Sequence, residues 1–301
     1  MAAEVSFGDA SAIGGSGAAA SAATSVRWEF VARHPRVLLG GGFVVVLAGL
    51  AIFAPVLAPF NPVETHPALA YQAPGAGHLL GTDNLGRDVM SRVIWGTRVS
   101  LEVGVISVTI GLLAGMAIGV AAGYTGGWLD ILLMRFIDAL LAFPAILLAI
   151  AITSALGAQL QNAMIAIGVT YVPIFARLSR GQVLQVRLAE YVQAARLAGG
   201  GPLRIVARHV LPNIANPMIV QATLTIALAI LAEATLSFLG LGAQPPTPSW
   251  GFDLNAARGY LVNNFWWMAI GPGVAILLTV LCFNFLGDAI RDALDPRLRD
   301  R

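Results

Sequence analysis

The segment Leu101–Ala122, LEVGVISVTIGLLAGMAIGVAA, decides the fold class. A helix of about 20 mostly apolar residues is long enough to cross a hydrocarbon core of about 30 Å. Apolar runs of similar character recur at Val37–Ala58, Ala139–Ala158, Ala163–Leu178, Met218–Leu241 and Trp267–Leu286. The sequence therefore predicts an all-α integral membrane protein with about six transmembrane helices.

The composition excludes several classes of protein. Of the 301 residues, 57% are hydrophobic and only 11% are charged, whereas a soluble domain has about 25% charged residues. A soluble globular enzyme is therefore not expected. The net charge of +2 is too small to favour a nucleic acid as partner.

The chemistry that this chain could carry is limited further by its residue types. All 18 basic residues are arginine, so the chain lacks the lysine of a P-loop or of a pyridoxal Schiff base. Cys282 is the single cysteine, and the four histidines are scattered. We expect no catalytic residues, no bound cofactor and no metal site in this chain.

Proline and arginine positions refine the topology. Pro144, Pro173 and Pro272 fall inside apolar runs and predict kinks in three helices. With the N-terminus inside, 14 arginines lie in cytoplasmic segments and 4 in external ones, as the positive-inside rule requires. Both termini are thus predicted to be cytoplasmic. The expected order is a disordered cytoplasmic tail (1–36), a first transmembrane anchor (37–58), an external segment (59–99), a transmembrane core (100–290) and a cytoplasmic tail (291–301).

The longest predicted cytoplasmic loop lies between the fourth and fifth runs and has a helical pattern. One apolar face recurs at helical spacing, through Leu188, Tyr191, Val192 and Ala195. Three glycines, 199–201, then predict an elbow, and Pro202 suits the start of a second helix that ends before Pro212. Two interpretations stay open: the elbow lies in a groove of a partner protein, or it rests on lipid headgroups.

Polar residues near the membrane also have two interpretations. Glu233 lies within the fifth run, where a charge is costly. It is either a gate or substrate contact, or a structural hydrogen-bonding group that uses Ser237 and Thr235. Arg135 and Asp138 are three residues apart, so we predict a local ion pair on one helix face.

A more specific pattern runs through the same loop. It consists of Glu190-Tyr191-Val192-Gln193-Ala194-Ala195-Arg196, Gly199 and Arg208-His209-Val210-Leu211-Pro212-Asn213. This pattern resembles the EAA loop of ABC importer permeases. Gln193 and His209 depart from the general pattern, but the spacing from Ala194 to Gly199 to Pro212 is kept. The variants resemble the dipeptide, oligopeptide and nickel branch.

Motifs outside the loop extend this resemblance over roughly residues 79 to 298. They include Leu80-Gly81-Thr82-Asp83, Gly86-Arg87-Asp88, Glu233-Ala234-x-Leu236-Ser237-Phe238-Leu239-Gly240, Pro248-Ser249-Trp250-Gly251 and Leu294-Asp295-Pro296-Arg297. In their order and topology they are similar to the C-type inner-membrane subunit of that branch. The resemblance thus implies the type I importer permease fold.

The resemblance implies a division of labour among subunits. A second permease would complete the pathway, one or two P-loop ATPases would bind ATP and magnesium, and an external protein would deliver the solute. The coupling loop, residues 187–213, would insert into an ATPase groove, with contacts expected from Glu190, Tyr191, Gln193, Ala194, Ala195, Arg196, Gly199, Arg208, His209, Leu211 and Pro212. A side chain at Gly199 is expected to clash where backbones approach.

Further roles follow from the same resemblance. The candidates for the pathway or gate are Glu233, Ser237, Gln244 and Trp250, and those for contact with the binding protein are Asp83, Arg87, Asp88 and Arg92. For these last four the alternative is an interfacial helix. The expected cargo is a dipeptide or oligopeptide, with nickel chelates or glutathione as alternatives. A proton-coupled secondary transporter that uses Glu233 is the rival of a different class.

Overall fold

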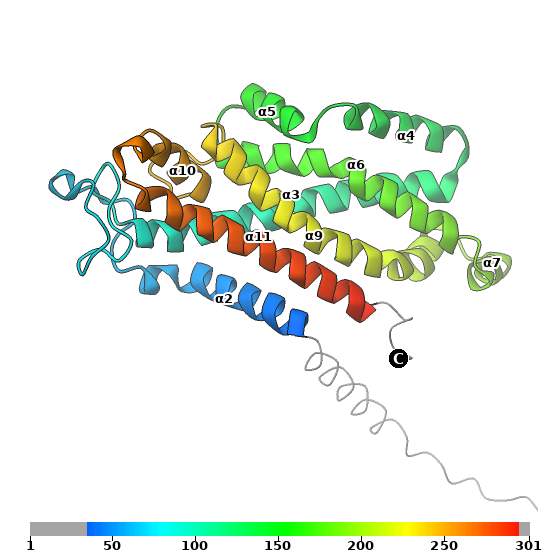
Figure 1. Ribbon diagram of the computed structural model, residues 1–301. Coiled ribbons are helices and arrows are strands. Elements are labelled where there is room, and N and C mark those ends of the chain that lie inside the picture. Colours follow the sequence, from blue (N-terminus) through cyan, green and yellow to red (C-terminus); the bar gives the residue numbers. More distant parts are fainter. Residues whose placement is uncertain (1–34, 295–301) are drawn as a thin grey trace, which may run out of the picture.

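The computed structural model describes residues 35–294, and its regular elements are helices, apart from one isolated bridge between Thr82 and Asp88 (Figure 1). The elements are α2 (Pro35–Leu57), η1 (Pro67–Leu69), α3 (Val89–Thr125), α4 (Gly127–Leu141), α5 (Ala145–Leu156), α6 (Leu160–Val186), α7 (Glu190–Leu197), α8 (Pro202–Ile205), η2 (Val206–Val210), α9 (Leu211–Phe238), α10 (Trp250–Arg258), η3 (Leu261–Asn263) and α11 (Trp267–Leu294). The predicted tails fall outside the described residues, except that 35–36 and 291–294 are helical.

A glycine seam joins α3 to α6. Its members recur every fourth residue at Gly111, Gly115, Gly119 and Gly123. A Cβ at the second would lie 2.5 Å from the Val172 carbonyl oxygen, and one at the third 2.3 Å from that of Ala176. Only glycine permits this approach of two helix backbones. Their contacts on α6 advance from Tyr171 to Val183, so α3 and α6 are parallel.

The segment between α3 and α6 must therefore return the chain across the bundle. It does so through α4 and α5, which form a broken span bent by 90°. The kink predicted in the run Ala139–Ala158 is a full break in the structure, because Pro144 disfavours a helical conformation at Phe143 and has no N–H to donate. Within residues 35–294, five helices are long and apolar enough to cross a membrane, and this broken pair brings the number of candidate spans to the six expected.

The other two prolines behave differently from Pro144. Helix α6 continues through Pro173, and α11 continues through Pro272. Of the three predicted kink sites, Pro144 is therefore the one at which the helix breaks. Prolines such as the other two are tolerated inside the membrane-spanning helices of a bundle.

Helix α3 begins at Val89, well before the predicted start of its span at Leu101. Asp88 caps it, since its carboxylate accepts a hydrogen bond from the Ser91 N–H at 2.7 Å. The predicted external segment, 59–99, therefore ends in a helix. The helix start was predicted too late because charged residues such as Arg92 were expected to lie in water. In the structure Arg92 is paired inside the protein.

The remaining long helices complete the bundle. Helix α2 packs against α11, where a Cβ at Gly40 would lie 2.7 Å from the backbone nitrogen of Leu286. Helices α4 and α5 lie on the opposite side of the bundle from α2 (Figure 1). We call the end that carries residues 59–88 and α10 the cap, and the opposite end, residues 187–213, the elbow.

Candidate functional site

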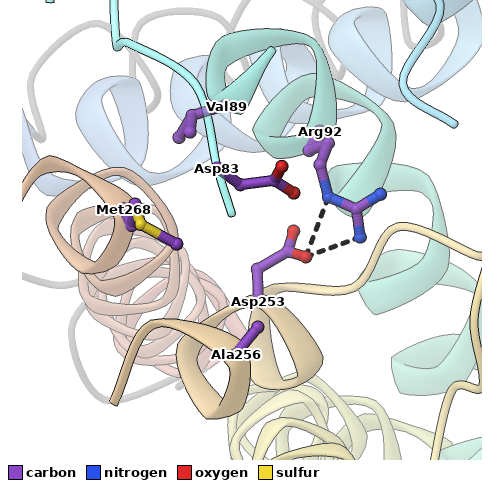
Figure 2. Close-up of a pocket in the computed structure, with 6 residues that line it drawn as sticks. All are labelled: Asp83, Val89, Arg92, Asp253, Ala256 and Met268. Atoms are coloured by element: carbon purple, nitrogen blue, oxygen red, sulfur yellow. Dashed lines mark hydrogen bonds and ion pairs between the residues drawn. The ribbon is translucent and has the colours of Figure 1, made fainter. Parts of the chain in front are cut away.

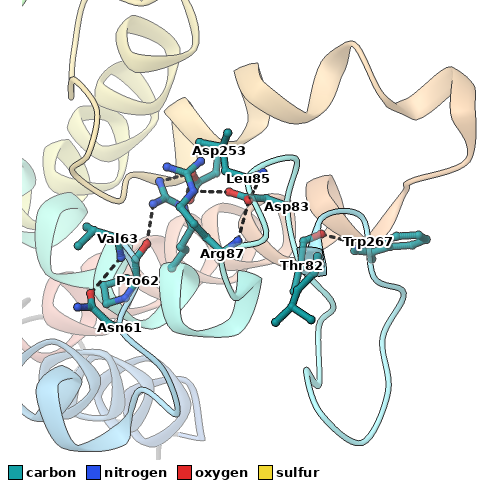
Figure 3. A network of polar contacts seen from close by, with 11 residues as sticks. Asn61, Pro62, Val63, Thr82, Asp83, Leu85, Arg87, Asp253 and Trp267 are labelled. Carbon is teal, nitrogen blue, oxygen red and sulfur yellow. Dashed lines mark hydrogen bonds and ion pairs between the residues drawn. The ribbon is translucent and has the colours of Figure 1, made fainter. Parts of the chain in front are cut away.

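An ion pair between distant segments holds the cap together. The Arg92 guanidinium donates to Asp253 Oδ1 from Nε at 2.9 Å and from Nη2 at 2.5 Å, and to the Pro62 carbonyl oxygen at 2.9 Å. Figure 2 shows the ion pair of Arg92 with Asp253, and Figure 3 shows Pro62 and Asp253 within the surrounding polar network. The side chain of Arg92 is only 2% exposed. It thus joins the 59–88 segment, α3 and α10 at one buried point.

Two further carboxylates order the loop before α3. Asp83 accepts hydrogen bonds from Arg87 Nε at 2.6 Å and from the backbone N–H groups of Leu85 and Arg87. Asp88 accepts from the Ser91 hydroxyl at 2.7 Å and lies 2.8 Å from His78 Nδ1. These contacts are charge-assisted hydrogen bonds inside the protein.

The four residues predicted to contact a binding protein are therefore not a docking surface. Asp83, Arg87, Asp88 and Arg92 are between 2% and 6% exposed. Their side chains bind one another, Asp253 and neighbouring backbone groups. The prediction that they contact a binding protein is therefore corrected. The alternative of an interfacial helix is wrong as well, since residues 83–88 form a loop.

A small cavity of about 10 Å³ lies inside this network, bordered by Asp83, Arg92, Asp253 and Met268 (Figure 2). This is room for about one water molecule. Asp253 Oδ2 is buried without a hydrogen-bond partner among residues 35–294. Burial raises the pKa of Asp253 above its ordinary value, although Arg92 acts in the opposite direction.

Glu233 is fully buried where three elements meet. Its carboxylate accepts hydrogen bonds from Ser237 at 2.7 Å and Ser249 at 2.9 Å, and Ser100 lies 3.5 Å away. Thr235, the other predicted partner, instead donates to a carbonyl oxygen of its own helix. Glu233 thus joins α3, α9 and the start of α10, which is the structural interpretation.

Two of the other three pathway candidates are buried, and one is exposed. Trp250 is 1% exposed, and its indole Nε1 donates to the Val93 carbonyl oxygen at 2.9 Å. Ser237 is buried between Glu233 and the Ala243 N–H. Glu233, Ser237 and Trp250 are therefore internal packing residues in this structure, not a pathway lining. Gln244 is exposed and remains a candidate.

The elbow turns through a regular helix-ending motif. Gly199 donates its N–H to the Arg196 carbonyl oxygen at 3.1 Å, and Gly200 donates to that of Ala195 at 3.0 Å. This is the Schellman pattern, with Gly199 at positive φ (+82°). The predicted clash at Gly199 is misplaced, because a Cβ there meets open space. At Gly200 it would lie 2.7 Å from the Ala195 oxygen.

The second helix of the elbow does not end at Pro212. Residues 202–205 are α-helical, 206–210 form a π-helical turn, and α9 follows at Leu211. Pro212 lies in the first turn of α9, directly after the π turn. The wider π turn lets one helical stretch run from 202 to 238, so the elbow is directly continuous with a transmembrane helix.

Exposure is distributed unevenly over the elbow. Val192 is the one residue of the predicted apolar face that is fully buried. Ile205 and Val210, which follow it in the elbow, are buried as well. By contrast, Leu197 is 90% exposed and Leu203 is 83% exposed. The other predicted contact residues are wholly or partly exposed: Glu190, Tyr191, Gln193, Ala194, Ala195, Arg196, Gly199, Arg208, His209, Leu211 and Pro212.

Two arginines tie the elbow to the end of α3. The guanidinium carbon of Arg196 lies 5.8 Å from the centre of the Tyr124 ring, within range of a cation–π contact. Arg187 donates to the Gly123 carbonyl oxygen at 2.7 Å. Because Gly123 belongs to the seam, the elbow is attached to α3 at a point where α3 packs closely against α6.

Two ion pairs link α4 to α6, and local sequence does not predict either. Asp138 pairs with Arg177 at 2.6 Å, not with Arg135, and Asp130 pairs with Arg180 at 2.6 Å. The predicted Arg135–Asp138 pair is therefore wrong. Among the described residues, no cluster of three or more His, Cys, Asp or Glu side chains is arranged to bind a metal.

Comparison with known proteins agrees with this architecture. Residues 115–300 match the family described as binding-protein-dependent transport system inner membrane component, and residues 26–74 match the N-terminal TM domain of oligopeptide transport permease C. The dipeptide transport system permease protein DppC of Alkalihalophilus pseudofirmus is 48% identical over 250 residues, covering 83% of this chain and 82% of that protein. The glutathione transport system permease protein GsiD of Pectobacterium atrosepticum is 42% identical over 273 residues, covering 90% of each.

The fold recurs in a solved structure. A chain of the MetNI methionine ABC transporter, in an inward-facing conformation, aligns with a TM-score of 0.58 at 21% identity. The alignment covers 69% of this chain and 98% of that one. The two chains therefore share the fold. By sequence and by fold, the chain belongs to the family of binding-protein-dependent transport system inner membrane components.

Proposed function

We propose that this chain is one of two permease subunits of an ATP-driven importer for dipeptides, oligopeptides or related small solutes. Family membership supports a permease that has no catalytic role of its own. Relatives named for dipeptide transport are 42% to 48% identical to it. Relatives named for glutathione transport, at 42% and 43%, favour glutathione as a second candidate. Glutathione is itself a small peptide.

Partner subunits supply what this chain lacks. Its sequence has no lysine, so the lysine that holds nucleotide phosphates must belong to another polypeptide. We place ATP and magnesium on one or two P-loop ATPase subunits. A second permease completes the pathway, and an external protein delivers the solute.

The elbow is placed on the cytoplasmic side of a bacterial inner membrane. Most arginines fall in the segments that this orientation leaves inside, which supports it. Both termini are then cytoplasmic, and the cap is external. The ATPases, which use cytoplasmic ATP, meet the elbow.

The exposed elbow is the single observation that carries the proposal. Leu197 and Leu203 stand almost fully exposed beside a buried base that fixes their position. Large apolar side chains held in this way mark an interface. Closure of the ATPase pair would push the elbow, and the seam would pass the movement to α3 and α6 as one unit.

Substitution at the elbow tests the proposal. In the complete transporter, Leu203→Asp should abolish ATP-dependent uptake of a labelled dipeptide and release the ATPase during purification, with the amount of folded permease unchanged. The matched control is Val262→Asp, since Val262 is 92% exposed at the cap. It should leave ATPase binding intact.

Two results would overturn the assignment. The first is ATPase binding that is equally strong in wild type and Leu203→Asp. The second is uptake that continues without ATP but stops when the proton gradient is collapsed, which would favour the proton-coupled alternative.

A further inference from the structure

The break between α4 and α5 lies in the middle of the bundle's thickness. Ile137, just before the break, packs in one cluster with Val172 and Ala176. These two residues occupy the middle of α6, which runs from 160 to 186. Leu141, the last residue of α4, is one turn beyond Ile137. The break therefore lies near the middle of the bundle, well away from both of its ends.

The break is nevertheless uncovered by the other residues that the structure describes. Each residue from 141 to 145 is exposed, and Phe143 is 60% exposed. Within residues 35–294, the N–H groups of Ala145, Ile146 and Leu147 have no hydrogen-bond acceptor. Unpaired backbone groups at this depth are not tolerated in lipid, but they are tolerated where they line water or protein.

Charged side chains on the same face require water independently. Arg177 and Asp138 pair across α6 and α4, with side chains 56% and 50% exposed. Arg177 lies well inside the α6 span. Ionised side chains at such depth face a bundle interior or a water-filled cavity and not hydrocarbon.

A polar hollow continues this face toward the elbow. It measures about 190 Å³ and is bordered by Asp130, Ile131, Met134, Arg135, Asp138 and Arg180. Asp138 belongs both to the hollow and to the ion pair beside the break. We call this continuous surface, made of Asp130, Arg135, Asp138, Arg177, Arg180 and residues 142–144, the open face.

We propose that the open face lines the water-filled pathway that the transported solute crosses. This inference rests on the proposed function and adds the location of the pathway, which the sequence had placed around Glu233. The open face carries charges of both signs, so it suits a solute with an ammonium and a carboxylate, as a peptide has. The second permease subunit closes the pathway on the opposite side.

Cysteine accessibility tests the inference. In a Cys282→Ala background, Phe143→Cys and Leu277→Cys are compared within the complete transporter in its membrane. Leu277 is a matched control, because it is 56% exposed and lies within the α11 span. Ala145→Cys is a second probe of the break in case Phe143→Cys lowers the yield.

A membrane-impermeant, water-soluble thiol reagent should modify Phe143→Cys at least about tenfold faster than Leu277→Cys, since only a hydrated thiol forms the reactive thiolate. Modification should block dipeptide uptake, and excess dipeptide should slow the modification. Equal rates at the two positions would overturn the inference, as would fast modification that neither affects uptake nor responds to dipeptide. Labelling rates do not require transport, so a Cys282→Ala transporter without ATP-dependent uptake would count against the proposed function alone.

Discussion

The two ends of the bundle use polar and apolar side chains in opposite ways. In the cap, Arg92 and Asp253 are turned inward and paired, so the charges hold the cap itself together. In the elbow, Leu197 and Leu203 are turned outward with nothing from residues 35–294 covering them. The difference shows that charge in a sequence does not by itself mark a contact surface.

The strongest test of this contrast is removal of the buried cap arginine. Arg92→Ala leaves Asp253 as an unpaired buried carboxylate, which should cost about 3–5 kcal/mol of folding stability. We expect loss of most folded protein, measured by yield of monodisperse permease and by thermal unfolding. Arg98→Ala is the control, since Arg98 lies on the same helix and is exposed. Equal stability of the two variants would remove the structural role of the cap pair.

The next test separates two adjacent glycines of the elbow. Gly200→Val places a side chain against the Ala195 carbonyl oxygen and should distort the turn, at a cost of about 1–3 kcal/mol. Uptake should fall severalfold while the cap remains intact. Gly199→Asn should be milder, because asparagine tolerates positive φ and a Cβ there is unobstructed. Uptake by the two variants at equal expression is the measurement, and a larger defect at Gly199 would contradict this ranking.

A smaller effect is expected at Glu233. The Gln side chain of Glu233→Gln keeps an acceptor for the hydroxyls of Ser237 and Ser249, so stability should change by about 1 kcal/mol or less. Uptake should stay within about twofold of wild type, as for a structural group. Loss of uptake at unchanged stability would restore the gate interpretation.

The smallest effect is expected at the contact between elbow and α3. Arg196→Gln removes a cation–π contact with Tyr124 that is worth about 0.5–1 kcal/mol at an exposed site. A slight decrease in the ATPase activity stimulated by solute should follow, with no change in yield. If Tyr124→Leu gives an equal decrease and the double variant adds nothing further, the two side chains act together.

The sequence predicts those features that depend on local pattern. Apolar runs locate the spans but not every boundary, since α3 begins well before its apolar run. The glycines of 199–201 locate the turn of the elbow. The four glycines of the seam are also a visible signal, since their spacing of four predicts a close helix contact. The identity of the partner helix is not contained in that spacing.

Long-range pairing is what local pattern cannot provide. Arg92 and Asp253 are 161 residues apart, and Asp138 meets Arg177 at a separation of 39. The spacing of residues along one helix instead favoured Arg135 as the partner of Asp138. Such spacing predicts only contacts between neighbours on the same helix face. The break at Pro144 was expected as a kink, but its exposure depends on how α4 and α5 pack on α6.

Photocrosslinking at position 203 tests the central claim most directly. A photoreactive amino acid replaces Leu203 in cells that express the complete transporter, and the crosslinked peptides are sequenced by mass spectrometry. The account predicts a peptide from a P-loop ATPase, and no such peptide when the same amino acid replaces Val262. Crosslinks from position 203 to lipid alone would contradict it, because the elbow would then rest on the membrane surface and could not receive force from an ATPase.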